Sequence, residues 1–429
     1  MVSVALLLMI VASIGISRAL LVKSECNTFG AVWAKAILSE YDVHLFEDYK
    51  ILGYHGNEIE VEDRLNYYLS YSAKGKLDAS IGKAQAELGG YELRDPDNFK
   101  KAIKNGIPNA AVASVLKGEG RKARRIDADP GEGKAANDGG ADTVGADRKI
   151  ANTLVLDTLP SKGVANTIDV KDIISTLKGG NPIKGISDKV TGNFTAFAFI
   201  HKYLNSHTKT AVDKPSYFTN EWEYIISGKP DDERNYKKCK RMIFLIRNGL
   251  NLTYLAKDPM KMEAITAASQ IITPGPLGAL TQTTIMEIWA GIESEYDVQD
   301  LIEGGRVPLI KDPTTWKTDI GAVFDCEKFA QRLDNESKKN LAGKRKELSE
   351  VGAANKIEAA KEGNDYEDYL MFLMLGLNEN TRMLRLMDIV QINMKYRYYE
   401  DFNLAEYYSG VKFALEVNGR DYSISDEYR

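Results

Sequence analysis

Cysteine and histidine are scarce in this sequence, and their arrangement excludes the commonest metal sites. Its 429 residues include three cysteines, Cys26, Cys239 and Cys326, and four histidines. The cysteines lie far apart without paired spacing, which excludes a zinc-finger pattern and a disulfide scaffold. We expect all three to be small buried apolar residues, with one disulfide among them as the open alternative.

Motifs for catalysis are also missing. The histidines, His44, His55, His201 and His207, belong to no H-E-x-x-H sequence. His201 and His207 are six residues apart, a spacing that does not place them together on one face of a helix. No G-x-S-x-G nucleophile elbow occurs either. We therefore predict that the protein is not an enzyme and has no catalytic residue, metal or cofactor.

A glycine–lysine pair in "EYIISGKPDDERN" raises the question of a phosphate loop. That loop needs G-x-x-x-x-G-K-[ST], but Glu223 takes the place of the first glycine and Pro230 that of the hydroxyl residue. The stretch instead predicts a turn between two helices. One helix ends at Gly228, and Asp231 or Asp232 caps the next helix.

Residues 117–149 contain no aromatic side chain and are rich in glycine, alanine, aspartate and lysine. Such a segment cannot bury enough apolar surface to offset the entropy lost on ordering, so we predict a flexible linker. Its "DADPGEG" at 127–133 resembles a calcium loop but has Glu132 where such a loop needs glycine. A solvated loop is the better interpretation.

Composition and charge define the general class of the protein. A hydrophobic content of 44% and a charged content of 27% are typical of a globular chain, and the length predicts two or three domains. The net charge of −5 argues against nucleic-acid binding, which needs a basic face. We predict no nucleic-acid partner.

No charged residue precedes Arg18 in the opening "MVSVALLLMIVASIGIS", and apolar character continues to Val22. This length spans a bilayer as a helix, so we predict a transmembrane helix over residues 1–22. A cleaved signal peptide is the alternative, but it would have a basic start and an A-x-A-like site. The missing basic start suggests that the sequence begins inside the hydrophobic segment.

The same helix is predicted to continue into the body of the protein. No proline occurs between Leu20 and Asp48, and apolar residues recur every three or four positions from Val22 to Leu45. An apolar half followed by an amphipathic half is the layout of pilin-like subunits. We predict that the side chains that contact lipid or partner helices are those of Leu7, Ile10, Ile14, Leu21, Phe29, Trp33 and Ile37.

Helical patterns dominate the remaining sequence. We predict helices over most of 58–105 and 194–310, breaks at "TPGPLG" and Gly304-Gly305, and a solvated helix or loop over 327–362. "VKFALEVNGRDYSIS" alternates apolar residues around Asn418-Gly419, which predicts a C-terminal β-hairpin.

The predicted fold is mainly α with small β elements (α+β), in five regions. They are a transmembrane helix (1–22), a pilin-like amphipathic helix with a helical subdomain (23–116), the linker (117–149), a helical core (150–310) and a C-terminal helical and hairpin region (311–429).

Several segments, in order, resemble a family of uncharacterised membrane-anchored proteins of Gram-positive Firmicutes. After the apolar start, the matching segments are "AILSEYDVHLFEDYKILGY", "EWEYIISGKPDDERN", "IRNGLNLTYL", "IEGGRVPLIKDPTTW" and "RMLRLMDIVQINMKYRYY". This family, a domain of unknown function, is encoded with tight-adherence (Flp/Tad) pilus genes and is TadE/TadG-like at its N-terminus. The resemblance supplies no catalytic residues.

The resemblance implies a non-enzymatic cell-envelope protein. It would be a single-pass membrane protein with an extracytoplasmic body, acting as an accessory or minor pilin-like component of a tight-adherence pilus or related secretion system. Its partners would be the lipid bilayer and other pilus or secretion-system subunits. The alternatives are an anchored cell-wall hydrolase and a lipid- or polymer-binding module that uses the C-terminal surface "MKYRYYEDF". The basic segment "KKCKR" is better interpreted as a solvated helix face than as a contact with anionic lipid.

Overall fold

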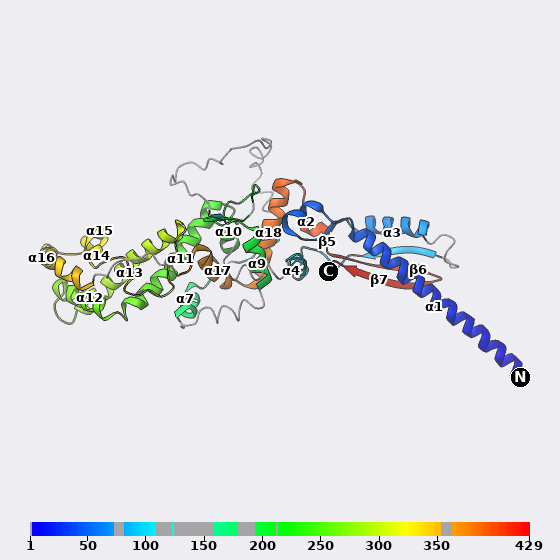
Figure 1. The fold of residues 1–429 in the computed structure, drawn as a ribbon, viewed down its shortest axis with the longest axis horizontal. Helices are drawn as coiled ribbons and strands as arrows, with labels where there is room; N and C mark the ends of the chain where they lie inside the picture. The colour runs from blue at the N-terminus through cyan, green and yellow to red at the C-terminus, as the bar shows by residue number, and fades with distance from the viewer. Residues whose placement is uncertain are drawn as a thin grey trace.

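The molecule is elongated, and its N-terminal helix projects from one end (Figure 1). The computed structural model describes residues 2–72, 81–107, 122–123, 158–165, 167–178, 194–211, 213–352 and 363–429. All but Lys122 and Ala123 of the predicted linker 117–149, including the calcium-like stretch 127–133, lies outside these residues. Three hydrophobic clusters follow one another along the described part of the molecule.

The first cluster joins the N-terminal helix to a sheet formed largely by the C-terminus. Helices α1 (Val2–Leu38) and α3 (Glu58–Ser72) pack on an antiparallel sheet in the order β2-β6-β7. The strands are β2 (Ile81–Glu87), β6 (Gly410–Val417) and β7 (Arg420–Glu427). Alternate residues of β6 face the helices and are buried, namely Val411, Phe413, Leu415 and Val417.

The second cluster forms the helical middle of the molecule. Its helices are α4 (Pro96–Gly106), α7 (Val170–Lys178), α9 (Phe194–Tyr203), α10 (Glu221–Ser227), α17 (Tyr366–Leu375), α18 (Glu379–Arg397) and the first part of α11 (Asp232–Leu255). Helix α18 is buried on nearly every side because α4, α10 and the short α2 (Val43–Tyr49) pack around it.

The third cluster lies at the end farthest from the N-terminus (Figure 1). It contains α12 (Pro259–Ile272), α13 (Gly278–Ile302), α14 (Gly321–Asp325), α15 (Glu327–Ala330) and α16 (Asn335–Gly352). Asp258 caps α12, and Pro259 occupies its first turn, where a missing N–H costs nothing. Helix α11 spans the second and third clusters.

Short elements tie distant parts of the chain together. Strand β1 (Tyr54–His55) pairs with β5 (Tyr407–Tyr408), and β3 (Lys122–Ala123) pairs with β4 (Lys209–Thr210). A 3-10 turn, η2 (Leu404–Glu406), precedes β5.

The mainly helical fold with a long apolar N-terminal helix is confirmed, and so is the C-terminal hairpin. Asn418 and Gly419 both adopt positive φ between β6 and β7, as the two-residue turn requires. The breaks at 273–277 and at Gly304 are confirmed as well, because they separate α12 from α13 and follow the end of α13.

Two predictions about the N-terminal third are wrong. The long helix does not continue to Asp48: α1 ends at Leu38, and a new helix starts after Asp42, whose side chain accepts a hydrogen bond from the Leu45 N–H. Segment 58–105 contains the predicted helices as α3 and α4, but the helical prediction is wrong between them, where β2 lies. In addition, residues 311–429, predicted as one region, contribute to all three clusters.

The glycine–lysine stretch is a turn between α10 and α11, as predicted. Gly228 ends α10 with φ 61°, and the Asp231 carboxylate accepts a hydrogen bond from the Arg234 N–H at 2.7 Å. The Arg385 guanidinium donates to the carbonyls of Ile225 and Ile226 at 2.9 Å. These carbonyls belong to the last turn of α10, which has no further helical N–H groups to pair with them.

We expect Gly228→Ala to destabilise the protein by roughly 2–4 kcal/mol, because a side chain strains the left-handed backbone and displaces a packed group. A Cβ there would lie 2.6 Å from Arg385 Cζ. Gly291→Ala, inside α13 with open space around it, is the matched control and should raise stability by up to about 1 kcal/mol. Urea unfolding curves measure both changes; equal effects at the two positions would contradict this account of the turn.

Candidate functional site

Helix α1 has two halves with opposite surroundings. Its first half, through Leu21, leaves the body and is exposed (Figure 1). The exposed fractions of its large apolar residues range from 50% at Ile10 to 75% at Met9. Such side chains are each stabilised by about 1.5–3 kcal/mol when removed from water. Burial of these side chains would therefore stabilise the protein, and the described residues do not cover them.

The second half of α1 is packed on the sheet from Val22 onward. Gly30 lies so close to β7 that an added Cβ would be 2.7 Å from Ile424 Cγ1. At the end of the helix, the Tyr428 hydroxyl donates a hydrogen bond to the Leu38 carbonyl at 2.6 Å. These contacts hold the helix along the sheet and leave the first half to project from it.

The seven predicted contact residues divide between these halves. Leu7, Ile10, Ile14 and Leu21 are exposed on the projecting half. Phe29 is half-buried and stacks on Trp33 at 5.9 Å between ring centroids. Trp33 and Ile37 are buried against the chain's own sheet, so they serve the internal core. Contact of the exposed residues with lipid or a partner stays a prediction.

One helix among the described residues has the length and apolar composition of a membrane span, and the candidate segment is Leu6–Leu38. A signal sequence has the same composition and place in the chain. By length and composition, the exposed half of α1 is a candidate for a membrane anchor or a signal sequence. In the described structure no group of three or more histidine, cysteine, aspartate or glutamate side chains is arranged to hold a metal ion.

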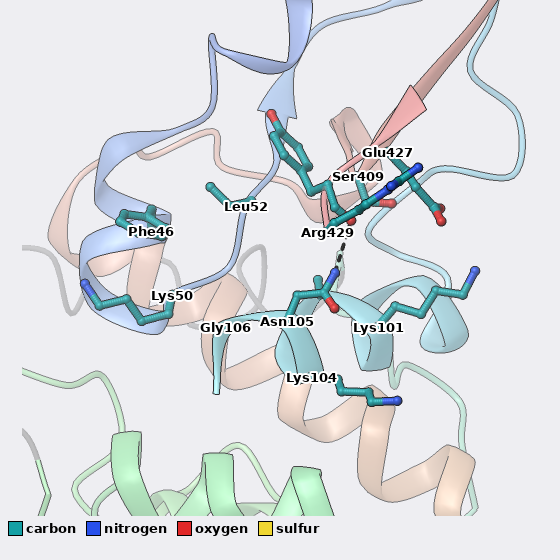
Figure 2. A pocket seen from close by; sticks show the side chains of 12 residues that line it. Phe46, Lys50, Leu52, Lys101, Lys104, Asn105, Gly106, Ser409, Glu427 and Arg429 are labelled. Carbon is teal, nitrogen blue, oxygen red and sulfur yellow. Dashed lines mark hydrogen bonds between the residues drawn. The ribbon is translucent and has the colours of Figure 1, made fainter. Parts of the chain in front are cut away.

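A pocket of about 340 Å³ lies between α2, α4 and the C-terminal end of β7 (Figure 2). Its rim carries the cationic residues Lys50, Lys101, Lys104 and Arg429. Asn105 Nδ2 donates to the Tyr428 carbonyl at 3.1 Å and ties α4 to the strand end. The lysine side chains spread around the rim and do not converge on one point (Figure 2). The pocket is basic, but its cations do not form a single binding centre.

Two buried carboxyl groups on α10 have strongly perturbed acidity. Glu221 accepts hydrogen bonds from Asn205 N and Asn393 Nδ2, both at 2.6 Å, and Glu223 accepts one from His207 N at 3.0 Å. Burial nevertheless raises the pKa of each to about 7, because the charged form loses its hydration. Both side chains are closed off from solvent and from substrates, so they are structural groups.

The raised pKa of Glu223 predicts a pH dependence of stability. Because the folded state binds this proton more tightly, the free energy of unfolding falls as pH rises from about 4.5 to about 7. Glu223→Gln keeps a neutral side chain of the same shape and should abolish its share of this fall, roughly 3 kcal/mol for the full shift. Urea midpoints at pH 5 and pH 8 measure the effect. The control is Glu233→Gln, at an exposed position; an unchanged pH slope in Glu223→Gln would contradict the prediction.

A fully buried ionic cluster joins α11, α13 and the segment after α13. Arg247 contacts Asp297 Oδ2 through Nε at 3.0 Å and Nη2 at 2.9 Å. Lys311 pairs with Glu293 at 2.5 Å and with Asp297 Oδ1 at 2.7 Å. Burial alone would raise the pKa of Asp297, but Arg247 and Lys311 hold it below its ordinary value. The cluster is compensated internally and is therefore structural.

The cysteines, His44 and the "KKCKR" segment, which were considered from the sequence as possible sites, are packed against other parts of the protein. The three cysteines are free thiols; Cys26 and Cys239 are buried as expected, whereas Cys326 is partly exposed, so the expectation that it is buried is wrong. His44 stacks on Tyr398 with ring centroids 4.0 Å apart. In the "KKCKR" segment the side chain of Cys239 points into the core, and Lys237 pairs with Glu233 on the exposed face.

A family model matches more than half of the chain, residues 146–419. Its description is a family of unknown function (DUF5702). The chain belongs to this family. The DUF5702 match begins after α4, so the projecting helix lies outside it. No curated protein and no solved structure is significantly similar to the chain.

Sequence patterns did not reveal the buried polar groups. Arg247 and Asn251 lie four residues apart on the face of α11 that also carries the buried Ile243 and Leu250. Polar residues on an apolar face were the available signal, since buried charges are rarely found without partners. Their partners, Asp297 and the carbonyls of Pro308 and Leu309, are too distant in sequence to be paired by inspection.

Proposed function

We propose that this protein is a non-enzymatic component of the cell envelope. Helix α1 crosses the membrane once, and the body lies on the extracytoplasmic side. The protein acts as an accessory or minor pilin-like component of a tight-adherence pilus or a related secretion system, and its exposed helix contacts lipid and neighbouring subunits.

The observation that carries the proposal is the division of α1 at Val22. A largely apolar helical half, with Arg18 as its one charged residue, projects from the body, and an amphipathic half is held on the sheet. This is the layout expected of a pilin-like subunit, in which one helix serves both the membrane and the soluble domain. The pilus association is supported by the ordered sequence segments that resemble a family encoded with such pili.

The alternative of an anchored hydrolase would need acidic or nucleophilic side chains that face an open cleft. Among the carboxyl groups whose pKa is raised, Glu221, Glu223 and Asp388 are buried. Asp368 is partly buried, and its carboxylate accepts a hydrogen bond from the Asp365 N–H at the start of α17. The basic pocket beside α4 presents lysines at its rim. The described residues therefore favour a binding or structural role over hydrolysis.

Fractionation of cells that express a C-terminally tagged protein tests the proposal. Cells are sheared, filaments, membranes and cytosol are separated, and protease access to the tag is measured on intact cells. We expect an accessible tag in the membrane or filament fraction. A protected tag, or a cytosolic protein, would overturn the proposed topology.

A further inference from the structure

Helix α3 exposes a cluster of aromatic side chains on the body. Tyr67 and Tyr71 are 60% and 74% exposed, and their ring centroids lie 5.0 Å apart. The ring of the neighbouring Tyr68 is 6.1 Å from that of Tyr67. Apolar surface of this kind is uncommon on a solvated helix, so its position relative to the projecting half of α1 is informative.

The contacts between α1 and β7 show where the body ends along α1. Gly30 lies against Ile424, and Leu38 bonds to Tyr428, so the two elements run in the same direction. Gly30 and Leu38 are eight residues apart along the helix, about 12 Å. Their partners Ile424 and Tyr428 are four residues apart along the strand, about 13 Å, so equal distances along the two elements match. Going back four strand residues from Ile424 reaches Arg420 at the hairpin tip. The same distance along α1 reaches the level of Leu21.

The contacts between α3 and β2 place the tyrosines at this same level. Asn66 of α3 accepts a hydrogen bond from the Ala84 N–H. Ala84 pairs with Leu415, which in turn pairs with Tyr422, so Asn66 lies level with Tyr422. Tyr71 follows Asn66 by five helix residues, about 7.5 Å, and Arg420 precedes Tyr422 by about 7 Å.

Tyr71, Arg420 and Leu21 therefore lie at one level across three elements. Figure 1 shows this arrangement: α3 and the β6–β7 hairpin end together where α1 leaves the body. We call this end, formed by Tyr67, Tyr71, Arg420 and the turn of α1 at Leu21, the basal face.

We propose that the basal face rests on the bilayer, with Tyr67 and Tyr71 in the headgroup region. This inference rests on the proposed membrane anchoring. The exposed apolar half of α1 ends at Leu21 and the half packed on the sheet begins at Val22, so a bilayer that surrounds the exposed half has its surface at the basal face. Tyrosine is suited to this interface because its ring is apolar and its hydroxyl is polar.

The first charged residues of α1 lie where a bilayer surface at the basal face would place them. Arg18 and Lys23 are the first charged residues of α1, and they lie on either side of the level of Leu21. A long cationic side chain such as that of Arg18 reaches from the edge of the hydrocarbon core into the headgroups. A bilayer at this level covers the tyrosines as a direct consequence of anchoring, and no further partner is needed.

Site-specific labelling of the full chain in vesicles tests the proposal. Cys326 is the one native thiol that is not buried, so Cys326→Ser provides the background. Tyr71→Cys carries an environment-sensitive fluorophore, and the matched control is Ile59→Cys, on the same helix, 71% exposed and about 18 Å farther from the basal face. The vesicles are phosphatidylcholine with a small fraction of headgroup-nitroxide lipid.

We expect the label at position 71 to be quenched by the nitroxide lipid several-fold more strongly than the label at position 59. Equal quenching at both positions would overturn the proposal. A label at position 71 that is shielded from water but not quenched by the lipid, in a way that depends on protein concentration, would assign the face to a second copy of the chain and would also overturn it.

Vesicle flotation, read before the quenching, separates this proposal from the anchoring on which it rests. A chain that does not float with vesicles refutes the anchoring and the basal contact together. A chain that floats but leaves position 71 in water refutes the basal contact alone.

Discussion

Replacing Ile10 and Ile14 by lysine is expected to move the protein from the membrane pellet to the soluble fraction. Both side chains are exposed on the projecting half of α1, so their replacement disturbs no internal contact. Each lysine at the centre of a membrane helix costs about 2.5–3.5 kcal/mol, and each lost isoleucine removes about 0.5 kcal/mol of favourable insertion. The two changes together oppose insertion by roughly 6–8 kcal/mol. Carbonate extraction followed by immunoblotting measures the partition.

The control for this experiment is the pair Leu277→Lys and Leu280→Lys. These two leucines are also exposed apolar residues, 67% and 72% exposed, but they lie at the start of α13, at the far end of the body. The control variant should stay in the pellet. Retention of the Ile10/Ile14 variant would show that the projecting half of α1 is not the anchor.

Arg247→Leu is expected to destabilise the protein by about 3–5 kcal/mol, because it leaves a buried carboxylate without its main partner. Arg247 is fully buried and also donates to the Tyr369 hydroxyl and to the carbonyls of Pro308 and Leu309, each at 3.0 Å. It thereby joins α11 to α17 and to the segment that follows α13. The melting temperature should fall by on the order of 10 °C.

The matched control is Arg241→Leu on the exposed face of the same helix, which should change the free energy of unfolding by less than about 0.5 kcal/mol. Thermal unfolding followed by tryptophan fluorescence suits this comparison because Trp289 and Trp316 are buried in the third cluster. A loss below about 1 kcal/mol for Arg247→Leu would mean that the cluster does not hold α11 and α13 together.

Local signals predicted the elements whose structure depends on neighbouring residues. The charge-free start produced the projecting helix. Asp231 caps α11 because an aspartate side chain satisfies the first free N–H groups of a helix. Asn418-Gly419 formed the hairpin turn because both residues tolerate positive φ.

Strand β2 could not be predicted because its sequence, "IGKAQAE", has no run of β-branched or alternating large apolar residues. It becomes a strand through pairing with β6, more than 300 residues away, and through α3 side chains that accept hydrogen bonds from its backbone. Glu62 and Asn66 supply these acceptors. Such non-local pairing leaves little trace in a single sequence.

The candidate site could be predicted only in part, because some of it depends on contacts between residues that are distant in sequence. The exposed Leu7, Ile10, Ile14 and Leu21 follow from the lack of charge. Trp33 belongs to an amphipathic pattern, which predicts burial but does not say whether a partner or the chain's own sheet covers it. The basal face arises only when α1, α3 and β7 are placed side by side.

The central claim is that the projecting half of α1 remains part of the protein and anchors it in the membrane. The intact mass of the protein purified from carbonate-washed membranes tests this claim most directly. The account predicts a membrane-bound protein that retains the helix through Leu21 and Val22. A soluble protein shortened near residue 22 would show that this segment is a cleaved signal sequence and would contradict the account.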